Sequence, residues 1–100
     1  MKITCIQMNM QFCRPEDNFL RVSELVEKAA ADQPDVILLP ETWNTGFFPK
    51  ENPELLADLR GQRTKALLGA LAAKHRVNIV AGSITDLQDG KLYNTCYVFD

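Results

Sequence analysis

A carboxylate directly follows a short apolar segment, and this position suits it to general-base chemistry. The segment Val36–Leu39 is apolar at every position, which is typical of a strand covered on both faces. Pro40 ends it, because proline cannot donate a ladder hydrogen bond. Glu41 would then lie at the carboxyl end of a core strand, where α/β sheets bind ligands. Neighbours such as Trp43 and Phe47 would partly desolvate the carboxylate and raise its pKa toward that of a general base. The alternative is a solvated loop glutamate.

Three aromatic residues follow Glu41, and their side chains have two interpretations. Trp43, Phe47 and Phe48 either line a substrate pocket beside the carboxylate or pack the loop itself. Gly46 is expected to adopt a positive φ that lets the loop turn back. We expect the other neighbours of Glu41 to come from residues 8–10, because the first strand should lie beside the second.

The remaining side chains capable of chemistry are better explained by structure. Cys5 and Cys96 fall within expected strands, so we expect both to be small buried hydrophobic residues. Cys13 lies in a loop without a base beside it, which does not favour a reactive thiolate. His75 stands at an expected helix C-terminus, where a histidine needs no role as ligand or base. Asn94 is expected to anchor backbone.

Length and composition restrict the class of protein. One hundred residues form one small domain at most, and 46% apolar with 24% charged residues is typical of a globular protein. The net charge of −2, with the cations spread along the chain, gives no surface for nucleic acid. No apolar run is long enough to span a bilayer, and the N-terminus lacks a signal peptide. Three unevenly spaced cysteines fit neither a disulfide framework nor a zinc site, which favours a reduced, cytoplasmic setting.

The periodicity of the first half predicts a strand, a helix and a second strand. Residues 2–8 alternate with apolar side chains on both faces, which predicts a strand buried on both sides. A helix follows from Pro15, with apolar residues three and four positions apart, and it should stop near Gln33 because proline follows. Residues 36–39 form the strand before Glu41.

The second half predicts a further helix and three strands. A helical turn is expected within residues 54–58, and a longer helix begins around Arg63. Residues 77–81 form another buried strand. The pair Asp89-Gly90 predicts a hairpin turn between strands at 83–87 and 92–99. The order implies right-handed parallel crossovers followed by an antiparallel hairpin, and thus an α/β fold with one mixed sheet and two helices on one face.

Four separated blocks of this sequence resemble the nitrilase superfamily of carbon–nitrogen hydrolases. In order along the chain they are Lys2–Met8, Asp35–Phe47, Val80–Ser83 and Tyr93–Thr95. The motif Pro-Glu-x-Trp-Asn-Thr-Gly-Phe is most similar to the branch of ω-amidases, which hydrolyse the side-chain amides of 2-oxo acids such as 2-oxoglutaramate. The resemblance implies that residues 1–100 are the N-terminal part of a single αββα sandwich domain. It also implies a homodimer or higher homo-oligomer, a small amide substrate, and neither a metal nor an organic cofactor.

The resemblance further implies a Glu-Lys-Cys catalytic set, of which this chain carries one member. In the family the cysteine attacks the amide carbon, the glutamate accepts the thiol proton and later activates water, and the lysine stabilises the oxyanion. The glutamate of the motif matches Glu41. The family's lysine and cysteine fall beyond residue 100, and neither Lys74 nor Lys91 matches the motif. The sequence therefore predicts an amidase whose residues 1–100 are inactive alone.

Two alternatives remain open at this point. One is a catalytically inactive fragment or small binding module with the same partial fold. The other is an unrelated flavodoxin-like module, which requires a glycine-rich phosphate loop after the first strand. Residues 8–12 contain no glycine, which counts against this second alternative.

Overall fold

The short apolar segments of the sequence form a four-stranded sheet. The computed structural model describes residues 1–47, 49 and 51–100. The strands of this sheet, in their spatial order, are β1 (Ile3–Cys5), β2 (Val36–Leu38), β4 (Asn78–Val80) and β7 (Val98–Phe99). The first three are parallel and β7 is antiparallel to β4. The parallel pairs follow from the two crossovers through helices, as predicted from the order of elements.

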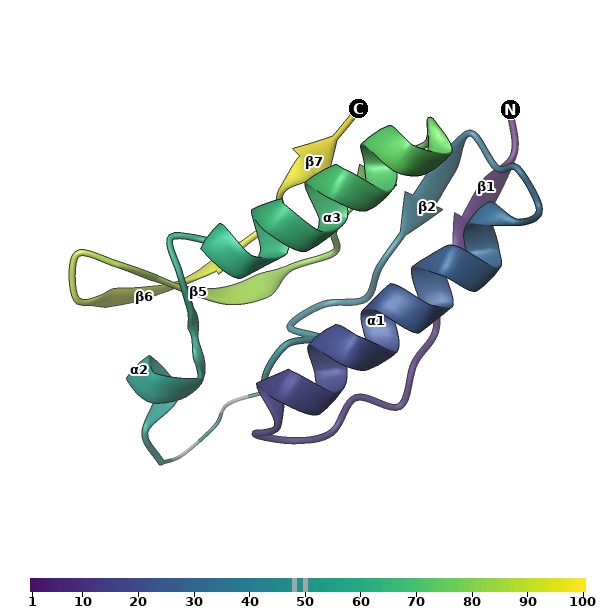
Figure 1. The fold of residues 1–100 in the computed structure, drawn as a ribbon. Coiled ribbons are helices and arrows are strands. Elements are labelled where there is room, and N and C mark those ends of the chain that lie inside the picture. The colour runs from purple at the N-terminus through teal and green to yellow at the C-terminus, as the bar shows by residue number, and fades with distance from the viewer. Residues whose placement is uncertain (48, 50) are drawn as a thin grey trace.

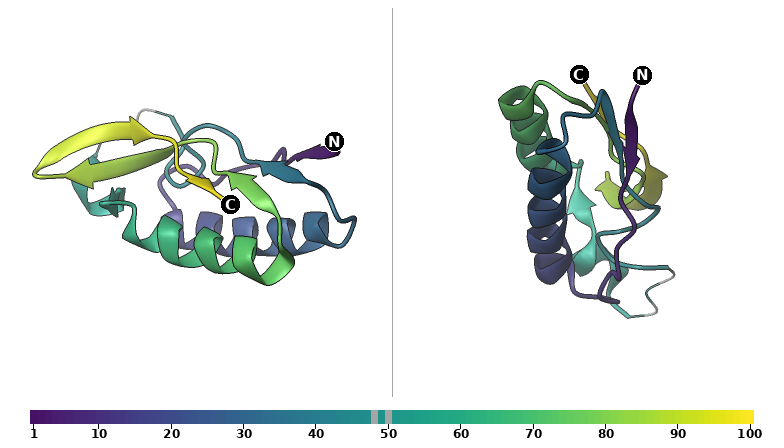
Figure 2. Two further views of the ribbon diagram at one scale, coloured as in Figure 1. Left: turned by 90° about the horizontal axis from the view of Figure 1, so that it is seen from above. Right: turned by 90° about the vertical axis from the view of Figure 1, so that its right-hand side faces the viewer.

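Two long helices cover one face of this sheet. Helices α1 (Pro15–Ala30) and α3 (Gln62–His75) lie side by side on the same face (Figures 1 and 2). Pro15 opens α1, and acidic residues fill its first turn, where the helix dipole favours negative charge. Both helices begin close to the predicted positions. The arrangement confirms a mixed sheet with two helices on one face.

The core lies between the helices and the sheet. Its fully buried aliphatic side chains come from both layers and from the residue that begins β5 (Ile84–Gln88): Val22, Val26, Ile37, Leu68, Ile79 and Ile84. Each such side chain stabilises the fold by about 1.5–3 kcal/mol relative to exposure. Ile37 and Ile79 are direct neighbours across β2 and β4, and these two strands contact α1 and α3 respectively.

A second sheet extends beyond the first, which the sequence did not predict. It contains β3 (Asp58–Leu59), β5 (Ile84–Gln88) and β6 (Lys91–Thr95), with the short helix α2 (Pro53–Leu56) leading into β3. Strand β3 is parallel to β5. Strand β5 forms an antiparallel hairpin with β6 (Figure 1). The turn residues Asp89 and Gly90 both have positive φ, 50° and 77°, which is the geometry of the predicted Asp-Gly hairpin.

The predicted strand over residues 92–99 divides between the two sheets. It splits into β6 and β7, and Tyr97 lies between them. The Tyr97 hydroxyl donates to the Asp86 carboxylate of β5 at 2.7 Å, while the Tyr97 carbonyl accepts the Ala81 N–H after β4 at 2.9 Å. These two contacts lead the chain from the second sheet back to the first, so the expectation of a single sheet is wrong.

The first strand is shorter and more exposed than predicted. Strand β1 covers only residues 3–5, and its Ile3 side chain is 53% exposed. Because β1 is an edge strand and its sheet has helices on one face only, the expectation of a strand buried on both sides is wrong. Cys5 and Cys96 are exposed as well, contrary to the expected burial, and Cys13 is partly buried.

Candidate functional site

Glu41 lies where β2 and β4 end, at the carboxyl edge of the parallel strands. The segments that follow β2 and β4 remain hydrogen-bonded to each other beyond the strands. The Leu39 N–H donates to the Val80 carbonyl at 3.0 Å, and the Ser83 N–H donates to the Pro40 carbonyl at 3.3 Å. The chain then turns at residues 41–45. Glu41 is the first residue of this turn, which is the predicted position at the end of a core strand.

Glu41 lines a cavity of about 370 Å³ between this turn and the second sheet. One wall carries Glu41, Thr42, Gly46 and Phe47, and the opposite wall carries Thr85 of β5 with Tyr93 and Asn94 of β6. The expected neighbours at residues 8–10 do not line it. Met8 and Met10 pack against the core instead, and the hairpin of the unpredicted second sheet takes their place.

The side chain of Glu41 is exposed within this concave setting. The expectation that apolar neighbours partly bury it is therefore wrong for the described residues. The cause lies in the two aromatic side chains that were expected to cover it. Trp43 is buried in the core, and the side chain of Phe47 is itself 51% exposed.

The aromatic residues after Glu41 have separate roles. Trp43 is fully buried, its indole N–H donates to the Ala81 carbonyl at 2.9 Å, and its ring meets Phe19 edge-on at 4.8 Å. Trp43 therefore packs the core, and the cavity wall does not include it. Phe47 lines the cavity. Phe48, the third pocket candidate, lies outside the described residues.

The turn after Glu41 is held in an unusual backbone conformation. Thr42 has φ of 46°, which is rare for a β-branched residue and costs about 1–3 kcal/mol. Its N–H donates to the Ser83 hydroxyl at 3.0 Å, and its carbonyl accepts the Gly46 N–H at 2.8 Å. Gly46 has φ of 81°, which confirms the predicted positive value. Such strain persists only where neighbouring contacts over-determine the conformation.

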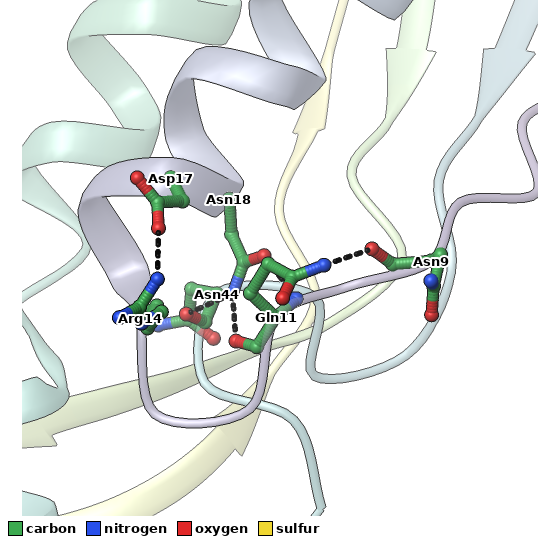
Figure 3. Close-up of polar contacts among 6 residues, drawn as sticks. All are labelled: Asn9, Gln11, Arg14, Asp17, Asn18 and Asn44. Atoms are coloured by element: carbon green, nitrogen blue, oxygen red, sulfur yellow. Dashed lines mark hydrogen bonds and ion pairs between the residues drawn. The ribbon is translucent and has the colours of Figure 1, made fainter.

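A buried polar network lies behind this turn, and sequence reasoning missed it. Asn18, Asn44 and Thr45 are buried although their side chains are polar. The Asn18 side-chain amide donates to the Asn44 carbonyl at 2.9 Å and to the Gln11 carbonyl at 2.8 Å (Figure 3). The Gln11 N–H donates back to Asn18 Oδ1 at 2.6 Å. The pair Asn44-Thr45, which stands between aromatic residues, was the sequence signal for this network. Polar residues in a segment that packs into the core must be hydrogen-bonded when buried.

Several titratable groups on the two long helices and around the second sheet have displaced pKa values. Arg63 bonds the Glu16 carboxylate at 2.6 Å and lowers its pKa. His75 contacts Glu27 at 2.9 Å, linking α3 to α1, which agrees with the structural role expected at the helix end. In the second sheet, burial raises the pKa of Asp86, but hydrogen bonds from Tyr97 and Gln88 outweigh it, so the net pKa is lowered.

The described part of the chain holds no group of three or more histidine, cysteine or acidic side chains that could bind a metal ion. Within the same residues, no helix has both the length and the apolar composition needed to cross a membrane.

The comparison with protein families gives one clear result. The profile of the carbon–nitrogen hydrolase family matches residues 2–100. Because this match covers nearly every residue, the chain belongs to the carbon–nitrogen hydrolase family.

Curated relatives and solved structures agree with this assignment. The chain is 36% identical over 98 residues to the 2-oxoglutaramate amidase of Bacillus subtilis, covering 98% of this chain and 37% of that protein. It is 31% identical over 98 residues to the human ω-amidase NIT2, covering 98% of this chain and 35% of that protein. The crystal structure of Saccharomyces cerevisiae Nit3, a nitrilase-superfamily member, superposes with a TM-score of 0.86 at 22% identity, over 100% of this chain and 40% of Nit3. This chain thus spans little more than a third of the length of these curated relatives.

Proposed function

We propose that the protein to which this chain belongs is an amidase that hydrolyses a small amide to a carboxylate and ammonia. The observation that carries the proposal is the family match over residues 2–100 together with the position of Glu41 on a cavity wall. Two of the similar curated proteins are a 2-oxoglutaramate amidase and an ω-amidase, which supports a 2-oxo acid amide as the substrate. The cavity, at about 370 Å³, lies toward the small end of the range for small-molecule sites, which is compatible with a small substrate.

In this proposal Glu41 is the general base of a Glu-Lys-Cys set. Its carboxylate accepts the proton of the cysteine thiol as the sulfur attacks the amide carbon, and it later activates the water that hydrolyses the thioester. The lysine stabilises the negative oxygen of the tetrahedral intermediate. The lysine and the cysteine of this set lie outside residues 1–100, which therefore form the N-terminal part of a single catalytic domain.

The cavity wall opposite Glu41 is suited to orient a polar substrate. Thr85, Tyr93 and Asn94 each carry a hydroxyl or amide group, and Phe47 and Leu92 supply apolar surface. Small-molecule sites combine apolar walls with a few polar groups in this way. We further propose a cytoplasmic protein that assembles as a homodimer or higher homo-oligomer. The free cysteines at positions 5, 13 and 96 support a reducing compartment.

The test is ammonia release from 2-oxoglutaramate and succinamate by the natural protein that contains this chain. We expect hydrolysis of at least one substrate and a fall in kcat of about 10²- to 10⁴-fold in Glu41→Gln, because the variant cannot accept the thiol proton. Equal kcat values for the wild type and Glu41→Gln would refute the assignment of the base. The polypeptide of residues 1–100 alone should release no ammonia above its own Glu41→Gln control, because it lacks the nucleophile.

A further inference from the structure

The side chain of Asn44 forms a bridge between the Glu41 turn and the second sheet. Its amide nitrogen donates to the Thr85 carbonyl at 3.0 Å, and its amide oxygen accepts the Thr85 N–H at 2.9 Å. Both the nitrogen and the oxygen of the amide are thus bonded to the backbone of Thr85, as a neighbouring strand would be. Asn44 is fully buried, so water does not compete for these bonds.

The backbone of Asn44 is held from the opposite side by α1. The Asn18 amide, in the first turns of α1, donates to the Asn44 carbonyl, and Asn18 is itself 1% exposed (Figure 3). Asn44 therefore lies between α1 and β5, with its main chain bonded to one and its side chain bonded to the other. Neither layer can move away from the turn without breaking buried hydrogen bonds.

Thr45, the next residue, also connects the turn to β5. The Thr45 and Thr85 hydroxyls lie 2.7 Å apart, and the Thr45 hydroxyl also donates to the Gly46 carbonyl at 2.9 Å. Thr85 is at the same time part of the cavity wall. The distance across the cavity, from the Glu41 wall to the β5 wall, is thus set by side chains that are bonded to each other.

We propose that Asn44 is a positioning residue for Glu41. Its paired amide holds the turn of residues 41–46 against β5, which keeps Thr42 at its unfavourable φ and fixes the direction in which Glu41 leaves the sheet. This inference rests on the proposed function only where it assigns the base to Glu41. The placement of the turn itself is tested separately below.

The identity of residue 44 matters because the bridge needs one donor and one acceptor. Asn44→Asp keeps an acceptor for the Thr85 N–H but loses the donor and places an oxygen against the Thr85 carbonyl. Asn44→Ala loses both bonds. Thr45→Val keeps the shape of the side chain and removes only the hydroxyl contact with Thr85, so it serves if the variants at position 44 fail to fold.

The matched control is Asn78→Ala. Asn78 is an exposed asparagine of β4, and its side-chain amide also donates to a backbone carbonyl, that of Asp35, at 3.3 Å. Its contact lies where β4 begins, whereas Glu41 follows the end of β2. The same substitution there removes a comparable group without touching the turn.

The kinetic test uses the natural protein that contains this chain. We expect both Asn44→Ala and Asn44→Asp to lower kcat by about 10²-fold with KM little changed, because a base displaced by about 1 Å loses that much. Asn78→Ala should match the wild type. In a Glu41→Gln background, Asn44→Asp should cost little further activity, since the group that it positions is already absent. A full additional 10²-fold loss in that background would overturn the proposal.

A second measurement does not depend on activity. Amide hydrogen exchange of residues 41–46, without substrate, should become faster in Asn44→Asp and Thr45→Val, while exchange in α3 stays as in the wild type. Unchanged exchange at residues 41–46 in both folded variants would overturn the positioning role. If Glu41→Gln instead keeps full activity, the proposed function fails, and the exchange result still decides whether Asn44 holds the turn.

Discussion

Removing the hydroxyl of Tyr97 should destabilise the protein, because that hydroxyl serves a completely buried carboxylate. Asp86 is 0% exposed, and its Oδ2 accepts hydrogen bonds from the Tyr97 hydroxyl at 2.7 Å and from the Gln88 amide at 2.8 Å. Its other oxygen, Oδ1, has no hydrogen-bond partner within the described part of the chain. Tyr97→Phe therefore removes one of the hydrogen bonds that offset the burial of this carboxylate.

The expected loss is roughly 2–3 kcal/mol in the free energy of unfolding at neutral pH. A hydrogen bond to a charged group contributes about 1.5–3 kcal/mol, and an isolated buried charge adds a desolvation penalty. Tyr93→Phe is the matched control. Tyr93 is 48% exposed on β6, and a substitution at such a surface position should change stability by less than about 0.5 kcal/mol.

The dependence of this loss on pH identifies its cause. Although burial raises the pKa of Asp86, the bonds from Tyr97 and Gln88 lower it below its ordinary value of 3.8. Because the pKa is lower in the folded state, the carboxylate stabilises the fold at every pH above its ordinary pKa. This stabilisation is lost as the pH falls through the pKa of the folded state. The difference between the wild type and Tyr97→Phe should therefore be full at neutral pH and shrink under acid.

The assay is urea unfolding of the protein that contains this chain, followed by circular dichroism from pH 7 down to about pH 3. A loss for Tyr97→Phe no larger than that for Tyr93→Phe would refute the reasoning. So would a loss that stays constant through the acid range. The double variant with Asp86→Asn should show a smaller effect of the Tyr97 substitution than the single variant, because the charge is gone.

Three further outcomes are expected. In the wild type, burial and the bond to Asp86 raise the pKa of Tyr97 from 10.0 to about 12. The free energy of unfolding should therefore fall by about 2–3 kcal/mol as the pH rises from about 10 to about 12, because the unfolded state loses the tyrosine proton first. Urea unfolding of Tyr97→Phe should show no such fall. Gly82→Ala should lower the melting temperature far more than Gly90→Ala, because both have positive φ but a Cβ at Gly82 would overlap the Pro40 carbonyl, whereas one at Gly90 meets open space; equal shifts would contradict this. The polypeptide of residues 1–100 should self-associate in light scattering, because apolar side chains such as Ile3 and Val98 are exposed on its four-stranded sheet, and a monomeric mass with a sharp melt would count against this.

The helices and the hairpin turn could be predicted from sequence because their signals are local. Pro15 with acidic residues after it marks a helix start, and Asp89-Gly90 supplies the two positive φ values that a two-residue turn needs. These elements appear where the patterns place them. Local patterns of this kind need no knowledge of the partner surface.

The second sheet could not be predicted because it depends on contacts between distant residues. Residues 92–99 read as one apolar strand, and only the bonds of Tyr97 to Asp86 and Ala81 show that they divide. Burial was unpredictable for the same reason. Cys5 has the pattern of a core strand, yet it is exposed because β1 lies at an edge.

The candidate site was partly predictable. The pattern of a strand followed by proline and glutamate located Glu41 at the end of β2. Of the two interpretations of Phe47, the one that places it on a pocket wall agrees with the structure. Sequence alone did not decide that Trp43 turns into the core. That outcome depends on Ala81 and Phe19, which lie 38 and 24 positions away in the chain.

The burial of Trp43 also gives this part of the protein an optical probe. Trp43 is the only tryptophan among these 100 residues, and it stands two positions after Glu41. Its indole is fully enclosed, bonded to the Ala81 carbonyl and in edge contact with Phe19, so its fluorescence should be blue-shifted while the turn is docked. Undocking of the turn would expose the indole to water and shift its emission to the red. The intrinsic fluorescence of Trp43 therefore reports whether the segment that carries Glu41 is in place.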